Sequence, residues 1–440
     1  MLFVRDVIND HKSSELYKSA WTSNEYANQR NIEAVRREKV YRDIAGRLKV
    51  NDFVPCHRMR TNIYNTVAVS FNSFLLGNGL SLSDKKQKEK LGRKFDTVLS
   101  KAGYAAITQT VSYIFWNKDH AELFTNLVFA PLMDETTSSL RAGVRWWQIA
   151  NDKPLRATLY EEDGYTEYVW NLNKDGQVNI DGEVLHEKVS YKYNTDKAPI
   201  DSEYTITNQQ NYPSFPIIPL WSNSQHINTF DGLKPTIDQI DELTNALNDD
   251  LTETQLYWMI QGADGMDKTD LAQFLRDMRE LKIINPAEGQ NVQPYTVTMP
   301  TADRQNEIAR LKHQVYEDFQ VIDINEIKGG AITATQIKAA YEPMNHKADD
   351  FEMCVLDCLY NLFQLIPGLE DEEPTFTRSL VINQSELIQS LVQAAQFINA
   401  PEYLTEKILS IIGDIDKTEE VIAEQKELEG QRFGVTNDAA

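Results

Sequence analysis

Apolar positions recur at helical spacing over the first part of the chain. Residues 10–48 read as helical and strongly charged, with few residues that break a helix. Residues 58–80 form an amphipathic pattern that stops at a glycine-bearing turn at 77–79, a usual end for a helix. A further helical stretch covers residues 84–116. The pattern therefore predicts a helical N-terminal part.

From about residue 120 to 221 the chain changes to alternating and aromatic-rich runs. Turn signals at 174–176 and 181–182 separate successive runs. This alternation predicts a meander of antiparallel strands whose aromatic side chains form the core of a sheet. The three prolines of "YPSFPIIPLW" at its end indicate an extended connection.

The second half predicts two long helices that flank a small insert. The first has apolar or small side chains three and four positions apart, at Ile237, Ile240, Thr244, Leu247 and Leu251. Its pattern fades near Gly262. Residues 267–300 then read as a charged helix and two short strands, and a second long helix follows over roughly 301–321.

A third long helix begins at Thr335 and carries a regular apolar seam. Its members alternate in steps of four and three: Ile337, Tyr341, Met344, Ala348, Phe351, Val355, Cys358 and Leu362. Pro343 lies inside the seam, where a proline removes a backbone hydrogen bond and predicts a kink. Residues 375–382 read as one strand, and two or three helices with an acidic end complete the chain. The elements together indicate an α+β fold.

The charge of the chain limits its partners. Its 440 residues suggest two or three domains, and 66 acidic against 44 basic side chains give a net charge of −22. Such a field repels DNA and anionic membrane surfaces, so it argues against a DNA-coating protein. It does not argue against a protein that encloses DNA without gripping it.

The three cysteines, at positions 56, 354 and 358, give no disulfide framework and suggest a reducing compartment. The N-terminus lacks the sustained apolar run of a signal peptide, and no run approaches the roughly 18 apolar residues of a membrane span. We therefore expect a cytoplasm-like setting and no contact with a membrane.

One segment, "NEIKGGAITATQIKAAYEPMNHKADDFE" at residues 325–352, raises the question of nucleotide chemistry. A phosphate-binding loop needs a strand, then G-x-x-x-x-G-K-[ST], then a helix. Here Lys328 precedes the glycines and the preceding segment reads as helical. The pattern favours a glycine connector that is flexible because it must move, over a nucleotide-dependent enzyme.

Other candidate chemistry is weaker still. Cys354 and Cys358 with His346 suggest a metal site, but the second ligand pair of a zinc site is missing, so core packing is favoured. Residues 55–60, "PCHRMR", read as a helix start with basic surface side chains. The "HKADD" run at 346–350 reads as a solvated face. These readings leave no enzyme motif, catalytic residue, metal or cofactor.

The order of these elements resembles the portal proteins of long-tailed bacteriophages. The likeness covers most of the chain and rests on four stretches: "NTVAVSFNSFLLGNGLSL", "FPIIPLWSNSQHINTFDGLKPTIDQIDELTNALNDDL", "IKGGAITATQIKAAYEPMNHKADDFE" and "TFTRSLVINQSELIQSLVQAA" with the acidic close that follows it. The chain departs from the family at one place. The family loop often reads Ser-Gly before its apolar run, whereas here Thr333 and Thr335 follow a Gly-Gly pair.

The resemblance implies the portal fold, with long stem helices, a β-rich and helical wing, a small α/β clip and a helical C-terminal crown. The expected parts, in chain order, are the wing (1–231, with the meander at 120–221), a stem helix (232–260), the clip (261–300), a second stem helix (301–323), the tunnel loop (324–334), a kinked helix and further wing (335–375), the crown (376–430) and a flexible tail (431–440).

The resemblance also implies a function. It predicts a dodecameric ring at one capsid vertex, assembled in the host cytoplasm and carried in the virion, through which double-stranded DNA is packaged and ejected. Its implied partners are further copies of itself, the terminase large subunit, a head–tail connector or adaptor, and the major capsid and scaffolding proteins. The residues expected at the DNA channel are Lys328, Gly329, Gly330, Thr333, Thr335 and Lys338. The alternative is a non-enzymatic intracellular scaffold or adaptor without a channel, which would be a monomer or dimer.

Overall fold

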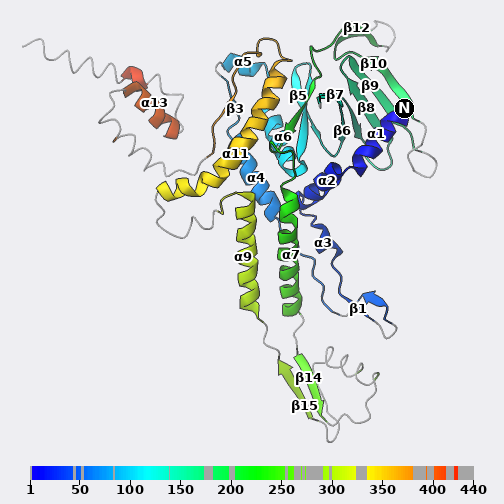
Figure 1. Cartoon of the computed structure of the whole chain (residues 1–440), viewed down its shortest axis with the longest axis vertical. Coiled ribbons are helices and arrows are strands. Elements are labelled where there is room, and N and C mark those ends of the chain that lie inside the picture. The colour runs from blue at the N-terminus through cyan, green and yellow to red at the C-terminus, as the bar shows by residue number, and fades with distance from the viewer. Residues whose placement is uncertain are drawn as a thin grey trace, which may run out of the picture.

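The computed structural model places most of the chain (Figure 1). It describes residues 2–42, 46–50, 54–82, 85–137, 139–172, 182–197, 204–252, 256–261, 291–296, 300–323, 334–379, 401–412 and 421–424, with single residues at 269, 273 and 393.

Three helices and a hairpin form the N-terminal part. They are α1 (Leu2–Ser13), α2 (Glu15–Ala27), α3 (Ile32–Arg36), and the paired strands β1 (Val40–Arg42) and β2 (Leu48–Val50). The prediction of a helix over 10–48 is therefore wrong in its last third. Two β-favouring residues, Val40 and Tyr41, lie in β1, and Gly46 takes a positive φ of 75° that no helix accommodates.

Two helices follow and pack on each other. They are α4 (Ile63–Leu76) and α6 (Phe95–Gln109), with the short β3 (Leu80–Ser81) and α5 (Lys85–Glu89) between them. The helix predicted over 84–116 ends early, because Thr110 adopts a positive φ of 70° and the β-favouring run "VSYIFW" follows it.

The predicted antiparallel meander is confirmed, and it begins earlier than expected, at Val111. The strands pair antiparallel in the orders β13-β4-β5, β10-β9-β8-β7-β6 and β11-β12. Their bounds are β4 (Val111–Asn117), β5 (His120–Thr125), β6 (Phe129–Met133), β7 (Leu140–Trp147), β8 (Leu155–Glu161), β9 (Gly164–Trp170), β10 (Glu183–Val189), β11 (Lys192–Lys197), β12 (Tyr204–Gln210) and β13 (Ile217–Trp221). The predicted turn at 174–176 lies outside the described residues.

Aromatic side chains fill the core, as the sequence predicted for the sheet. Phe115 lies 5.5 Å from Phe124 and 5.2 Å from Tyr160 between ring centroids, within one buried cluster. The same cluster extends into the helices, where Phe71 of α4 meets Phe319 at 6.1 Å and Phe351 at 5.7 Å. Helix α4 therefore joins the sheets to the long helices of the second half.

Two long helices lie side by side below the sheets (Figure 1). They are α7 (Phe230–Thr252) and α9 (Thr301–Phe319), and the Arg304 guanidinium of α9 is paired with the Asp250 carboxylate of α7. Figure 1 shows a small two-stranded sheet at the end of this pair that is remote from the larger sheets. Its strands are β14 (Leu256–Gln261) and β15 (Asn291–Thr296).

The first long helix is shorter than predicted. The expectation of one helix over 232–260 is wrong, because α7 ends at Thr252 and the run "LYWMIQ" is a strand paired with β15. Aromatic and β-branched side chains favour that strand. The insert expected at 261–300 thus includes residues from 256 on, and most of its expected charged helix lies outside the described residues.

The remaining elements follow the prediction in part. Helix α11 (Ala334–Phe363) matches the third long helix, and its seam is buried at Tyr341, Met344, Ala348, Phe351, Val355, Cys358 and Leu362. The strand predicted at 375–382 is confirmed only at β16 (Thr375–Phe376), which pairs with β3. Residues 377–379 are not in a strand, and residues 380–382 lie outside the described residues. Helix α13 (Pro401–Ile412) lies where C-terminal helices were expected. The predicted tail at 431–440 lies outside the described residues.

A polar face of α7 binds the chain segment that precedes α4. We call residues 54–61 the strap. Three α7 side chains, each four residues after the last, accept backbone N–H groups of alternate strap residues: Asp241 from Thr61 at 2.7 Å, Asn245 from Met59 at 2.6 Å, and Asp249 from His57 at 2.7 Å. The amide of Asn245 also donates to the Met59 carbonyl at 2.9 Å. The helix start predicted over 55–60 is therefore wrong, since α4 begins only at Ile63.

The spacing of the acceptors along α7 matches the spacing of the N–H donors along the strap. Four residues of an α-helix rise by about 6 Å. Two residues of an extended chain span roughly 6–7 Å. Side chains at every fourth helix position therefore stay level with every second strap residue. The backbone N–H of each of these three strap residues finds an acceptor. This register holds the strap along α7.

The pKa values of the two carboxylates on this face, Asp241 and Asp249, are shifted in opposite directions. Burial by itself would raise the pKa of Asp249, but hydrogen bonds from His57 and Arg37 outweigh it and hold that pKa at about 2. For Asp241, burial outweighs the hydrogen bonds from Asn31 and Thr61 and raises its pKa to about 6. Asp249 thus contributes stability that is present above its ordinary pKa and is lost as the pH falls toward 2.

We expect Asn245→Ala to destabilise the fold by about 2 kcal/mol, because it removes two hydrogen bonds and leaves both polar backbone groups of Met59 unpaired. Urea unfolding measures this loss. The matched control is Asn248→Ala on the same helix, whose amide donates to the Thr244 carbonyl of α7 itself. Equal losses in the two variants would contradict the assigned role of the strap.

Candidate functional site

The residues predicted at the channel lie where the chain passes from α9 to α11. Four of them fall in the segment 324–333, which is outside the described residues: Lys328, Gly329, Gly330 and Thr333. Thr335 and Lys338 lie in the first turns of α11. The structure thus assigns the last two to a helix and describes both ends of the segment, at Asp323 and Ala334.

Pro343 lies inside α11, ten residues after the last residue of that segment. Proline has no N–H, so the carbonyl of Ala339 four residues earlier loses its helical partner. The kink expected here remains a prediction.

The end of α9 is fixed by a capping motif. Gln320 takes a left-handed conformation, with φ 59° and ψ 41°. Its N–H bonds the Glu317 carbonyl, and the N–H of Val321 bonds the Tyr316 carbonyl, both at 2.9 Å. This pair of bonds is the Schellman arrangement, and the buried Val321 supplies the apolar contact that accompanies it. The chain therefore leaves α9 in a set direction.

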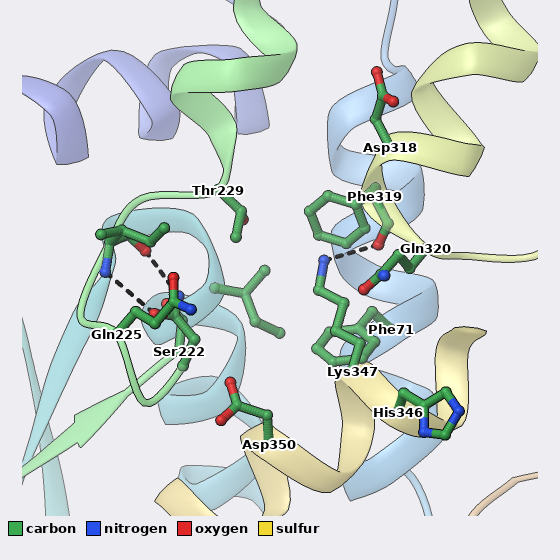
Figure 2. Close-up of a pocket in the computed structure, with 13 residues that line it drawn as sticks. Phe71, Ser222, Gln225, Thr229, Asp318, Phe319, Gln320, His346, Lys347 and Asp350 are labelled. Atoms are coloured by element: carbon green, nitrogen blue, oxygen red, sulfur yellow. Dashed lines mark hydrogen bonds between the residues drawn. The ribbon is translucent and has the colours of Figure 1, made fainter. Parts of the chain in front are cut away.

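A lysine of α11 clamps the same helix end. The ammonium nitrogen of Lys347 lies 2.8 Å from the Phe319 carbonyl and donates to it (Figure 2). It also lies 3.3 Å from the ring centroid of Phe319 and 5.0 Å from that of Phe71. The last carbonyls of a helix lack partners within it and carry the negative end of its dipole, so a cation fits there.

This position changes the chemistry of the lysine. Burial disfavours the charged ammonium by more than these contacts favour it, and lowers the pKa of Lys347 to about 7. The "HKADD" run was predicted as a solvated face, and for Lys347 that prediction is wrong. His346 and Asp349 of the same run are exposed, as expected.

A cavity of about 310 Å³ lies beside the clamp. Its walls come from α4, α6, the connection between β13 and α7, the end of α9, and α11 (Figure 2). On one side Asp350 accepts the N–H of Ser224 at 3.2 Å, which ties α11 to that connection. The cavity thus lies where four helices and the β13–α7 connection meet.

The described residues of this region lack the parts of a catalytic or metal site. Among them no group of three or more His, Cys, Asp or Glu side chains could hold a metal ion. Cys358 is buried, which confirms its predicted role in core packing, and burial raises its thiol pKa. Cys354 is half-buried, and burial raises its pKa to about 11. Both thiols are therefore poor nucleophiles and ligands at neutral pH.

His57 has a structural contact instead of a catalytic one. Its Nδ1 lies 2.7 Å from the same Asp249 oxygen that accepts its backbone N–H. The neighbouring Cys56 thiol donates to the Arg37 carbonyl at 3.6 Å. The two side chains therefore hold the strap, in line with the view that their adjacency indicates no nucleophile.

The family model described as "Phage portal protein, SPP1 Gp6-like" matches residues 5–432. The chain belongs to this family of phage portal proteins. The portal protein of Bacillus phage SPP1 is 22% identical over 419 residues, which are 89% of this chain and 79% of that protein. The fold of this chain combines helices with antiparallel sheets and is of the α+β class, as predicted.

Solved structures give a weaker likeness to this portal chain. The neck of a native gene transfer agent particle computed with C12 symmetry is 10% identical, with a TM-score of 0.43, over 79% of this chain and 89% of that one. The virion of the native gene transfer agent particle has a TM-score of 0.41 at 10% identity, over 79% of this chain and 87% of that chain. Among the described residues of the portal chain, no helix is long and apolar enough to cross a membrane.

We predict that the Lys347 clamp makes the stability of this portal chain depend on pH. The folded pKa of about 7 lies below the ordinary value of 10.5, so the unfolded chain binds more protons between these limits. Stability therefore rises with pH from about 7 toward 10, by an amount on the order of a few kcal/mol. Lys347→Met should remove that rise in urea unfolding measured across this range.

The control for this experiment is Lys101→Met, at an exposed lysine of α6. It should keep the full rise, because the change leaves Lys347 and its contacts in place. A rise that persists in Lys347→Met would show that another group causes it.

Proposed function

We propose that this chain is the subunit of a closed ring at one vertex of a phage capsid, and that double-stranded DNA passes through the ring during packaging and ejection. The observation that carries the proposal is the match to the portal family over residues 5–432. A portal ring has no reaction to catalyse, so we also propose that the chain is not an enzyme.

The elements fit named parts of such a ring. In the proposal, α7 and α9 are the stem, and the sheet of β14 and β15 belongs to the clip. The antiparallel strands and the N-terminal helices form the wing, and the crown lies at 376–430. The two ends of the α7–α9 pair differ, as a stem with a clip at one end and a tunnel loop at the other requires. One end carries the small sheet of β14 and β15, and the other adjoins the segment 324–333 (Figure 1).

Residues 324–334 act as the tunnel loop in this proposal. The Schellman motif and Lys347 fix the α9 end of the loop. Gly329 and Gly330 then give the loop freedom to shift as DNA passes, because glycine adopts backbone conformations closed to other residues. Movement is confined to the loop, while its α9 end stays in place.

The charge of the chain suits a conduit. Tight phosphate contacts would release counterions and hold the duplex in place. A net charge of −22 keeps that grip weak. In this proposal Lys328 and Lys338 are the basic residues that touch the DNA backbone. The proposal therefore combines a repelling wall with a few local contacts.

The partners follow from the same proposal. The clip meets the terminase large subunit during packaging and the head–tail connector afterwards. The wing meets the major capsid and scaffolding proteins. Hydrolysis of ATP belongs to the terminase. The ring is assembled in the host cytoplasm and stays in the virion.

The mass of the purified chain tests the ring. Light scattering should give about twelve copies of the 50.4 kDa chain, roughly 600 kDa, and negative-stain images should show a central hole. If the chain is monomeric alone, the same measurement is made with the scaffolding and capsid proteins added. A monomer or dimer under both conditions would contradict the ring and favour the adaptor.

Lys328→Ala tests the loop. We expect this variant to assemble normally but to package less DNA, or to release packaged DNA more readily, because it loses a phosphate contact. Packaged DNA that is protected from nuclease gives the measurement. Lys101→Ala, at an exposed lysine of α6, is the control that should match the wild type. Normal packaging and retention in the Lys328 variant would count against its role.

A further inference from the structure

The hairpin of β1 and β2 exposes an apolar face. Its register pairs Val40 with Val50 and Arg42 with Leu48, so these four side chains share one face. Val40, Leu48 and Val50 are 54%, 61% and 47% exposed. Figure 1 shows β1 standing away from α7 and from the sheets. A two-stranded hairpin is only marginally stable by itself in water. An exposed apolar face on such a hairpin is therefore typical of a site that binds another surface.

The hairpin differs in charge from the rest of the chain. Residues 36–50 hold six basic side chains, at Arg36, Arg37, Lys39, Arg42, Arg47 and Lys49. They hold two acidic ones, Glu38 and Asp43, which gives a local charge of +4. The whole chain carries −22, so the remaining residues carry −26. Arg37 and Lys39 are paired with acidic side chains of α7 in the same chain. The other four basic side chains still outnumber the two acidic ones, so the hairpin is complementary in charge to the acidic remainder of another copy.

The root of the hairpin is held on α7. Arg37 bonds Glu242 at 2.7 Å and Asp249 at 2.5 Å, and Lys39, directly before β1, lies 3.3 Å from Asp249. The strap that follows β2 is fixed to the same helix face. Because both ends are anchored, the hairpin loses less conformational freedom on binding than a free arm would.

We propose that this hairpin docks on the neighbouring copy in the ring, with its apolar face buried in the contact and its basic side chains against acidic side chains of that copy. This contact rests on the proposed portal function. Two hairpins would repel each other, because both are basic. The contact therefore joins two different surfaces, and such a head-to-tail contact closes into a ring when the rotation between copies allows it.

Two double variants test the contact. Val40→Thr with Leu48→Thr removes apolar area but keeps residues that favour strands, and Val40→Asp with Leu48→Asp adds charge. We expect either pair to weaken assembly by roughly tenfold or more, as for central contacts of an interface. Analytical ultracentrifugation measures this, under the conditions in which the wild type assembles. The thermal midpoint of the unassembled chain should stay unchanged.

The matched control is Ile149→Thr, which changes an apolar side chain that is 82% exposed, in the connection between β7 and β8. It should assemble like the wild type. Assembly should also weaken as salt is raised, because the complementary charges are then screened.

The other outcomes separate the two proposals. If the double variants assemble as the wild type does, the hairpin contact is wrong and the ring stands. If they assemble normally but lose binding to a short DNA duplex that the wild type binds, the hairpin is a nucleic-acid contact and the proposal is again wrong. If the wild type fails to assemble even with scaffolding and capsid proteins, both proposals fail.

Discussion

The hydrogen-bonded register between α7 and the strap is the constraint on which the rest of the structure depends. Asp241, Asn245 and Asp249 present acceptors along one helix face at the spacing of alternate strap residues. Each acceptor pairs a half-buried backbone N–H of the strap. The strap leads directly into α4, whose Phe71 packs against both α9 and α11. The register therefore positions the long helices relative to the sheets.

Two sets of contacts hold the long helices in place: the polar face of α7 and the clamp at Lys347. The first fixes the N-terminal part of the chain along α7, and Arg304 joins α7 to α9 through Asp250. The second fixes the end of α9 against α11 at the Phe319 carbonyl. Between these attachments lies the segment 324–333, which the proposed function places in the bore. In that proposal, the fixed end of α9 confines movement to the segment itself.

The sequence predicted the long helices and the antiparallel meander, because apolar periodicity reports which face of an element is buried. It missed the switches from helix to strand after Thr110 and Thr252. Both depend on pairing with distant strands, β13 with β4 and β14 with β15, and local pattern carries little information on that. The available signal was the β-branched and aromatic composition of "VSYIFW" and "LYWMIQ".

The sequence also failed to predict the hydrogen bonds between α7 and the strap and the contact between Lys347 and the end of α9, for a similar reason. The polar residues at 241, 245 and 249 have helical spacing, yet a solvated face has the same spacing, and only the tertiary structure shows what they bind. Lys347 lies beside Ala348 of the apolar seam, so the sequence could have predicted its position next to the core. Its acceptor is a backbone carbonyl of α9, and no sequence pattern predicts that contact.

The most direct test of this account is a reconstruction of the assembled particle by electron cryomicroscopy. The account predicts a closed ring in which α7 and α9 of every copy surround a central hole wide enough for a DNA duplex. The segment 324–333 should face the axis, and the sheet of β14 and β15 should lie at one mouth. An open assembly, or a ring with these helices on its outer surface, would contradict it.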